Sequence, residues 1–235
     1  MSIIPDKPPF KLLDILYKKE FVLFVVLVSI LIINSNISPY FLDLYNLIDS
    51  TFLFSEKAII ALTMTFVIIA RQIDLSVASI IAVSSVVLGY TTSLGYDTWL
   101  VLLLTLLSGA LCGAFNGAII TKFAIPSLIV TIGTMSLFRG LAYSFLEDSY
   151  YNKFPKLVGK LGGGYLYGYI PYAFLTFILL AFVFAFILHK TSVGKKIYSI
   201  GNNPDAAQYT GIAVDKYTFV LFTLNGLLSA RAAIL

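Results

Sequence analysis

Repeated apolar stretches restrict the folds open to this 235-residue sequence more than any other feature. Each is about twenty residues long, the length that an α-helix needs to cross the hydrocarbon core of a bilayer. The stretches cover residues 20–36, 51–70, 75–94, 98–120, 125–146, 170–188 and 217–235. A composition of 59% hydrophobic and only 12% charged residues also excludes an ordinary soluble domain. The sequence therefore predicts an all-α, polytopic bundle of about seven transmembrane helices over residues 20–235, after a tail at residues 1–19.

The distribution of positive charge predicts how the chain is oriented. If the tail is cytoplasmic, the inside segments hold ten basic residues, namely Lys7, Lys11, Lys18, Lys19, Arg71, Lys122, Lys190, Lys195, Lys196 and Lys216. The outside segments then hold four, namely Lys57, Lys153, Lys156 and Lys160. This asymmetry follows the positive-inside rule and predicts a multi-pass protein with a cytoplasmic N-terminus. It also accounts for the net charge of +4, so no nucleic-acid partner is needed to explain it.

A short polar helix is expected at residues 203–211, within a cytoplasmic loop at 189–216. Asn203 can cap the helix, Pro204 suits its first position, and Gly211 can adopt the left-handed conformation that ends it. The first turns also contain a negative charge and two small side chains, at Asp205, Ala206 and Ala207. Such a helix is either a capped connector or a surface on which another protein docks.

Residues that could support enzyme chemistry are sparse. Cys112 lies in an apolar stretch and suits packing, while His189 lies at the end of another stretch, where it can complement the helix dipole. No nucleophile grouping, no cluster with metal-ligand spacing and no phosphate-binding G-x-x-x-x-G-K-[ST] loop is present in the sequence. We therefore expect no catalytic residue, no metal and no cofactor, and any ATP hydrolysis on a separate chain.

Small residues in the stretch at 98–120 predict close helix packing. Gly109, Gly113 and Gly117 form two overlapping G-x-x-x-G steps on one helix face. In lipid, helices associate largely through backbone approach and van der Waals contact, which glycine permits. Asn116 lies beside this face, and its amide can serve either packing or a polar pathway.

Two charged residues interrupt apolar stretches. Asp74 is placed to cap the helix that follows it, with Arg71 as a possible charge partner. A compatible alternative places Asp74 in a broken helix that lines a cavity. Arg139 is costly within a bilayer and should face the bundle interior or reach the outer interface.

These residues together resemble the ribose-type sugar permeases of the ABC importer class. The run Ile73-Asp74-Leu75-Ser76-Val77 is similar to the family motif G-G-I-D-L-S-V-G, and residues 200–212 resemble its cytoplasmic coupling loop, with Asp205 replacing a glutamate of the E-A-A-x-x-x-G pattern. The central signature is matched by Gly109 through Asn116-Gly117, Ile125-Pro126, Thr131, Gly133-Thr134-Met135 and Arg139-Gly140. These blocks cover most of residues 58–235.

The resemblance implies the permease subunit of a monosaccharide importer in a bacterial inner membrane, with a fold like that of the cobalamin importer. Its implied partners are a cytoplasmic ABC ATPase, a periplasmic or extracellular sugar-binding protein and a second permease subunit, identical or different. The implied ATPase-coupling residues are Asn203, Asp205, Ala206, Ala207 and Gly211. The candidate pathway residues are Asp74, Ser76, Asn116, Thr131, Thr134 and Arg139.

Some features depart from the family pattern. Arg71 and Gln72 replace two glycines, Ala78 replaces another, and Arg231 interrupts the last stretch. Because that stretch ends without a polar flank, we also expect a C-terminally truncated permease, and a non-functional fragment is one alternative. The other alternative is a secondary transporter driven by an ion gradient, with Asp74 as its coupling site.

Overall fold

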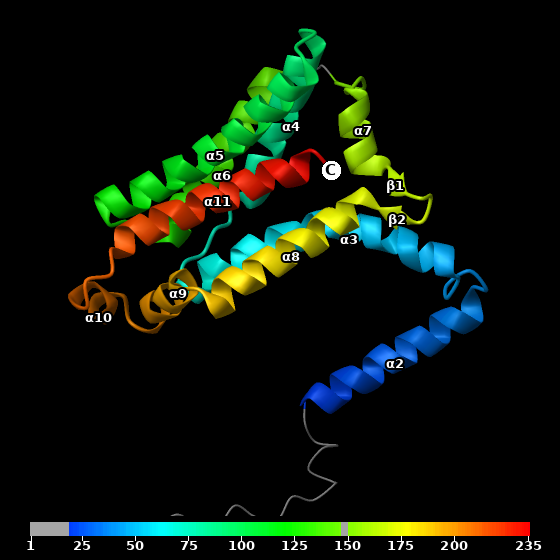
Figure 1. The fold of residues 1–235 in the computed structure, drawn as a ribbon, viewed down its shortest axis with the longest axis horizontal. Coiled ribbons are helices and arrows are strands. Elements are labelled where there is room, and N and C mark those ends of the chain that lie inside the picture. The colour runs from blue at the N-terminus through cyan, green and yellow to red at the C-terminus, as the bar shows by residue number, and fades with distance from the viewer. Residues whose placement is uncertain (1–18, 147–149) are drawn as a thin grey trace, which may run out of the picture. The chain divides into compact units, whose positions relative to one another are not determined.

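The computed structural model describes residues 19–146 and 150–235 (Figure 1). Most of the expected tail, including Lys7, Lys11 and Lys18, lies outside the described residues. The chain divides into two compact units, residues 1–47 and 48–235. In the first unit, helix α2 (Lys19–Ile37) is apolar around its whole circumference, and none of these nineteen residues is buried.

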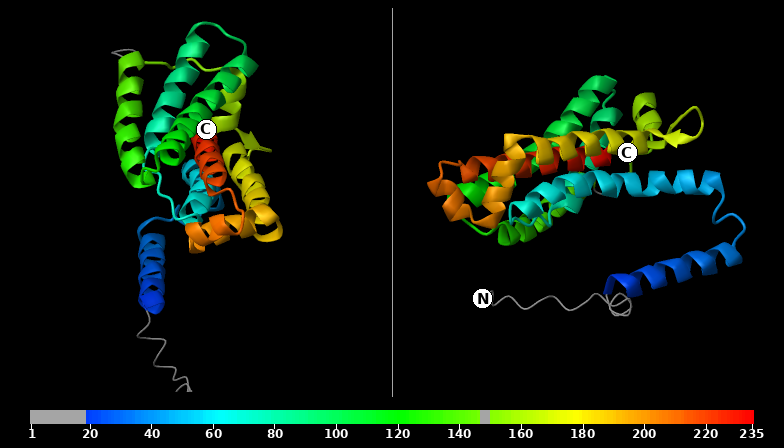
Figure 2. Two further views of the ribbon diagram at one scale, coloured as in Figure 1. Left: turned by 90° about the vertical axis from the view of Figure 1, so that its left-hand side faces the viewer. Right: turned by 60° about the horizontal axis from the view of Figure 1, so that its bottom comes forward.

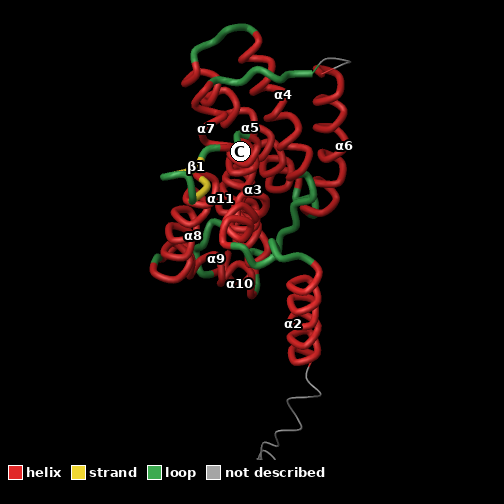
Figure 3. The backbone as a smooth tube through the Cα atoms, turned by 90° about the vertical axis from the view of Figure 1, so that its right-hand side faces the viewer, coloured by secondary structure: helices red, strands yellow, loops and turns green. Residues whose placement is uncertain are grey.

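The second unit is a helical bundle, as the sequence predicts. A hairpin of two short strands, β1 (Tyr165–Leu166) and β2 (Ile170–Pro171), is the one sheet in the described part of the chain (Figure 3). The long helices are α3 (Leu44–Ile69), α4 (Val77–Ser93), α5 (Thr98–Phe123), α6 (Ser127–Leu146), α8 (Tyr172–Lys190) and α11 (Val214–Ala233). The first four residues of α3 belong to the first unit. The shorter helices are α7 (Lys156–Gly163), α9 (Ser192–Asn202) and α10 (Pro204–Tyr209).

Five of the described helices are long and apolar enough to cross a membrane, which is fewer than the seven stretches predicted. They are α2, α3, α5, α6 and α8. Helix α4 has only 17 residues. Helix α11 has 20 residues but does not qualify, because Asp215, Lys216 and Arg231 add charge to it and lower its hydropathy.

Local sequence signals fix several helix ends. Asp97 caps α5 by accepting a hydrogen bond from the backbone N–H of Trp99 at 2.9 Å. Helix α5 ends at Phe123 and is followed by Ala124, whose φ of 51° is left-handed, two residues before Pro126. Helix α3 begins seven residues earlier than its apolar stretch predicts.

Helix α11 packs along α5, and both contact α4, which also contacts α6 (Figures 1 and 2). The contact between α5 and α11 depends on glycine. A Cβ added at Gly113 would overlap the carbonyl oxygen of Phe222, and one at Gly226 would overlap that of Gly109. A Cβ at Gly117 would lie 3.0 Å from the Cα of Phe219. The glycine face predicted on α5 therefore lies against α11, with the two backbones in close approach.

Aromatic contacts join α3 to α8. The rings of Phe66 and Phe184 meet edge to face with 5.1 Å between centroids. Nearer the other end of α3, Phe54 contacts Phe174 and Phe177 at 6.0 and 6.2 Å. These contacts hold the two helices side by side (Figure 2).

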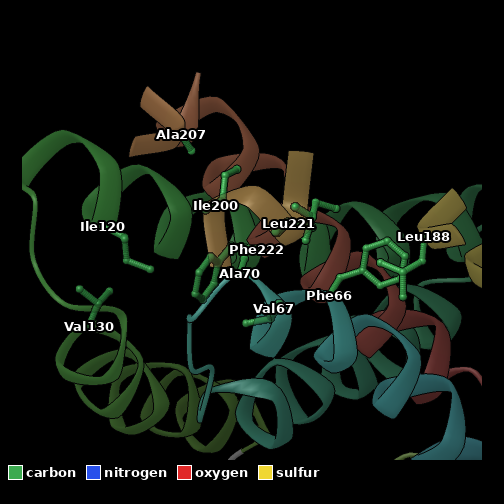
Figure 4. Packing of buried hydrophobic residues seen from close by; sticks show 11 residues of the cluster. Phe66, Val67, Ala70, Ile120, Val130, Leu188, Ile200, Ala207, Leu221 and Phe222 are labelled. Carbon is green, nitrogen blue, oxygen red and sulfur yellow. The ribbon is translucent and has the colours of Figure 1, made fainter. Parts of the chain in front are cut away.

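The two ends of the bundle differ. Helices α9 and α10 lie at one end, and α7 with the hairpin lies at the other (Figures 1 and 2). At the α9–α10 end, a buried apolar cluster joins residues of α3, α5, α6, α8 and α11 to Ile197, Ile200 and Ala207 (Figure 4). A second cluster packs Val158 of α7 against Leu88, Val101 and Ile234.

Candidate functional site

A buried polar network centres on the segment between α3 and α4. Helix α3 ends at Ile69, and Arg71 then adopts a φ of 60°, in the left-handed region that favours glycine. The backbone N–H of Ile73 donates to the hydroxyl of Ser127 at 3.1 Å. Asp74 follows, with only 2% of its surface exposed.

Both carboxyl oxygens of Asp74 accept hydrogen bonds. Oδ1 accepts from the backbone N–H of Ser76 at 2.9 Å and from its hydroxyl at 2.6 Å. Oδ2 accepts from the amide Nδ2 of Asn225 on α11 at 2.7 Å. Burying a polar group costs free energy unless the group is hydrogen-bonded. These three hydrogen bonds therefore offset the cost of burying the Asp74 carboxyl group.

Two further side chains extend the network. Asn225 Oδ1 accepts from the hydroxyl of Thr63 on α3 at 2.7 Å. On the other side, Asn116 Nδ2 on α5 donates to the hydroxyl of Ser76 at 2.8 Å. Asn116 Oδ1 is buried and has no hydrogen-bond partner among the described residues. The network thus connects α3, α5, α11 and the segment before α4.

Thr131 and Thr134, both on α6, are buried beside this network. The hydroxyl of Thr131 donates to the carbonyl oxygen of Ile73 at 3.4 Å. The hydroxyl of Thr134 donates to the carbonyl oxygen of Thr131 within its own helix, at 3.5 Å. Thr131 therefore joins α6 to the segment that holds Asp74, whereas Thr134 does not.

The structure corrects the expectation for Asp74 and excludes one of the two alternatives for Arg139 within this chain. Ser76, and not Asp74, occupies the N-cap position of α4, and Asp74 forms no ion pair with Arg71, since both are described and Arg71 is exposed. Arg139 is exposed on α6 and does not face the interior of this chain. It lines a groove with Ser85, Tyr143, Tyr150 and Tyr151. The candidate pathway residues consequently divide into a buried network and a separate exposed arginine.

The expected polar helix is α10. Asn203 Oδ1 accepts from the backbone N–H of Ala206 at 3.1 Å, and Pro204 takes the first helical position. Gly211 has a φ of 84°, so it supplies the predicted left-handed residue after the helix. Helix α9, which lies within the predicted loop at 189–216 and was not expected, comes directly before it. The end of α9 abuts α3, because a Cβ at Gly201 would overlap the carbonyl oxygen of Ile69.

The two alanines of α10 face opposite ways. Ala206 is exposed, whereas Ala207 is 2% exposed and packs in the chain's own apolar cluster (Figure 4). If the helix is a docking surface, the sequence places both small side chains on it, and the burial of Ala207 contradicts this for Ala207. The exposed surface of α10 instead consists of Asp205, Ala206, Gln208 and Tyr209.

Sequence reasoning missed three members of the network: Thr63, Ser127 and Asn225. One signal for Asn225 was available, because Asn225-Gly226 repeats the dipeptide Asn116-Gly117 within an apolar helix. Thr63 and Ser127 carry no comparable signal, since hydroxyl side chains are common in transmembrane helices and often bond their own backbone.

The family model for a branched-chain amino acid transport system permease component matches residues 46–235. This match covers the network, the glycine contact and α10 together. The chain belongs to this permease family. This match and the relatives described next together confirm the resemblance of its motifs to ABC sugar permeases. Several apolar helices agree with a multi-pass membrane protein.

Curated relatives are importer permeases. The chain is 32% identical to the autoinducer 2 import system permease protein LsrD of Klebsiella pneumoniae, over 92% of this chain and 66% of the relative. It is 34% identical to the LsrC permease of the same kind of system from Escherichia coli, over 75% and 51%. It is 33% identical to the ribose import permease protein RbsC of Haemophilus influenzae, over 90% and 67%. The chain thus spans between half and two thirds of these relatives' length, and no solved structure matches it significantly.

Proposed function

We propose that this chain is a membrane-spanning permease subunit of an ATP-driven, binding-protein-dependent importer. Its solute is a monosaccharide or a related small polar molecule. Family membership supports this role, and the names of its relatives, which import autoinducer 2 or ribose, support the solute class. ATP hydrolysis takes place on a separate cytoplasmic subunit, a binding protein delivers the solute from outside, and a second permease subunit completes the pathway.

The main support for this proposal is that α10 is packed against the bundle on one side and exposed on the other. Its cap at Asn203, its stop at Gly211 and its buried Ala207 fix the helix to the bundle, while Asp205 and Ala206 remain exposed. A rigid, exposed helix at the proposed cytoplasmic end suits a surface that receives motion from an ATPase.

A continuous set of contacts leads from α10 into the bundle. Ala207 packs with Ile200 of α9 in the apolar cluster that also includes Phe222 of α11. Gly201 abuts the end of α3, which carries Thr63. Displacement of α10 therefore acts on α3 and α11, the two helices that Asn225 joins beside Asp74. We propose that this network lets the two helices move with the segment before α4 during transport.

The test combines ATPase retention with solute uptake. This chain is reconstituted in proteoliposomes with the ATPase and binding protein of its system, and uptake of labelled ribose is measured with and without ATP. We expect uptake to need both ATP and the binding protein. In the variant Ala206→Glu, both the retention of the ATPase and the uptake of the solute should fall at least about tenfold. A charged side chain on the exposed surface of α10 would obstruct the close approach of the ATPase.

Ala206→Ser is the matched control and should retain the ATPase. Thermal unfolding of both variants should resemble that of the unmodified chain, because position 206 is exposed. Ala207→Glu is unsuitable, since it places a charge in the chain's own core. Wild-type retention and uptake by Ala206→Glu, or uptake driven by a proton gradient without ATP, would refute the proposal.

A further inference from the structure

A cavity of about 660 Å³ lies between α3, α8, α9 and α11, beside the connection from α10 to α11. This volume is within the range of pockets that enclose small ligands, roughly 300–1,000 Å³. Its walls come from all four helices and from the connecting segment Gly211, Ile212 and Ala213. The cavity is separate from the Asp74 network, which it meets only at Thr63.

The walls are predominantly apolar. Phe66 and Phe184 form one side, and Val220, Leu221 and Leu224 of α11 form another. Three lining side chains carry a hydroxyl group, namely Thr63, Thr191 and Tyr217. Two of these groups are already used, because Thr63 donates to Asn225 Oδ1 at 2.7 Å and Thr191 donates to the carbonyl oxygen of Ile187 at 2.6 Å. A sugar would therefore leave most of its hydroxyl groups unpaired here, and the lining favours a hydrocarbon chain.

Positive charge is confined to one end of the cavity. Lys196 of α9 and Lys216 of α11 line it, and both are exposed. The ammonium of Lys196 lies 5.7 Å from the ring centroid of Tyr217, which also lines the cavity. No carboxylate is among the lining residues, and neither lysine forms an ion pair with a described acidic residue. The two charges therefore remain available to an anion.

The positive charge and the apolar lining of the cavity follow one another along the axis of α11. Leu224 lies eight positions after Lys216 on α11, which corresponds to about 12 Å along the helix axis. A suitable ligand thus has an anionic head at the lysines and an apolar tail beside Leu224. Basic pockets between transmembrane helices at the cytoplasmic side bind the head groups of anionic lipids.

We propose that this cavity binds an anionic phospholipid of the cytoplasmic leaflet, with its phosphate between Lys196 and Lys216 and an acyl chain against Phe66, Phe184 and Leu224. The bound lipid contacts the segment Gly211–Ala213 and so stiffens the connection between α10 and α11. This inference goes beyond the proposed transport function, because lipid binding is measurable on the purified chain alone.

The test is native mass spectrometry of the chain in neutral detergent, titrated with phosphatidylglycerol, with phosphatidylcholine and with inorganic phosphate. We expect one tightly held phosphatidylglycerol and weaker retention of phosphatidylcholine. The double variant Lys196→Gln/Lys216→Gln should bind phosphatidylglycerol about 30-fold more weakly. Each lysine near an anionic lipid surface contributes about 1 kcal/mol, and the sum of about 2 kcal/mol corresponds to that change in affinity.

The matched control is Lys190→Gln/Lys195→Gln, which removes two exposed lysines from the same region that do not line the cavity. Its affinity for phosphatidylglycerol should stay within about twofold of the unmodified chain. Leu224→Trp, which fills the apolar part, should weaken lipid binding while both lysines remain.

Four results would overturn the proposal. Phosphatidylcholine could bind as tightly as phosphatidylglycerol, or the control pair could lose as much affinity as the cavity pair. Inorganic phosphate could displace the lipid at low concentration, which would indicate a site for a free anion. A lipid-free dimer of this chain that resists phosphatidylglycerol would show that a second copy covers the cavity.

Discussion

Asn225 is the residue on which the buried network depends most. Both polar atoms of its side-chain amide form hydrogen bonds: Nδ2 donates to Asp74 and Oδ1 accepts from Thr63. No apolar side chain of similar size can replace both bonds. Asp74 and Thr63 are each at most 2% exposed, so water cannot readily take the place of the amide.

We therefore predict that Asn225→Leu destabilises the chain by about 1–3 kcal/mol, the cost of leaving buried polar groups without their partners. Chemical unfolding in detergent measures the change. Thr223→Val is the control on the same helix, because the Thr223 hydroxyl donates only to its own backbone at Phe219 and the residue is not buried. It should change stability by less than about 0.5 kcal/mol. Equal stability of the two variants would contradict the bridging role of Asn225.

At the scale of helices, α5 and α11 are held together by close backbone approach. Gly113 lies against the carbonyl oxygen of Phe222, which is backbone and cannot rotate away. Gly133 on α6 provides a comparison, because a Cβ added there meets no atom within 4 Å. Both glycines are inside helices, so intrinsic helix propensity favours alanine at each by about the same amount.

Gly113→Ala should consequently destabilise the chain by about 1–3 kcal/mol through overpacking, whereas Gly133→Ala should be neutral or stabilising by up to about 1 kcal/mol. Thermal unfolding of the two variants in one detergent gives the comparison. If Gly113→Ala were as stable as Gly133→Ala, α5 and α11 could not meet as closely as the structure places them.

The sequence predicts most of these helices but not all their packing. Apolar length gives α2, α3, α5, α6 and α8, while cap and stop residues give α10, because both signals are local. Helix α9 escapes prediction, since Gly194 and two lysines make its sequence polar, and it is fixed by burial of Ile197 and Ile200. The inward face of Ala207 escapes for the same reason: six residues carry no periodic pattern that identifies a buried side.

The candidate site, too, is only partly predictable from local sequence patterns. Asp74, Ser76 and Asn116 stand out because they are polar residues within apolar sequence. Their connection to Thr63 and Asn225 depends on α11 lying between α5 and α3, a contact across some 150 residues of chain that no local pattern encodes.

For the whole of residues 48–235, charge distinguishes the two ends of the bundle. Lysines and arginines at helix ends and in α9 gather near α10, namely Arg71, Lys122, Lys190, Lys195, Lys196 and Lys216. The opposite end has Lys153, Lys156, Lys160 and, in the last turn of α11, Arg231. This asymmetry of positive charge predicts that the α10 end faces the cytoplasm.

Cysteine labelling tests this orientation. In a Cys112→Ser background, which removes the one cysteine of the chain, the exposed positions Lys156 of α7 and Lys195 of α9 are each replaced by cysteine. A membrane-impermeant maleimide applied to intact spheroplasts should label Lys156→Cys at least about tenfold more than Lys195→Cys. Permeabilised membranes should label both equally, because both positions are exposed in the fold. The reverse pattern in intact spheroplasts would place α10 outside, where no cytoplasmic ATPase could reach it, and would refute the orientation and the proposed coupling together.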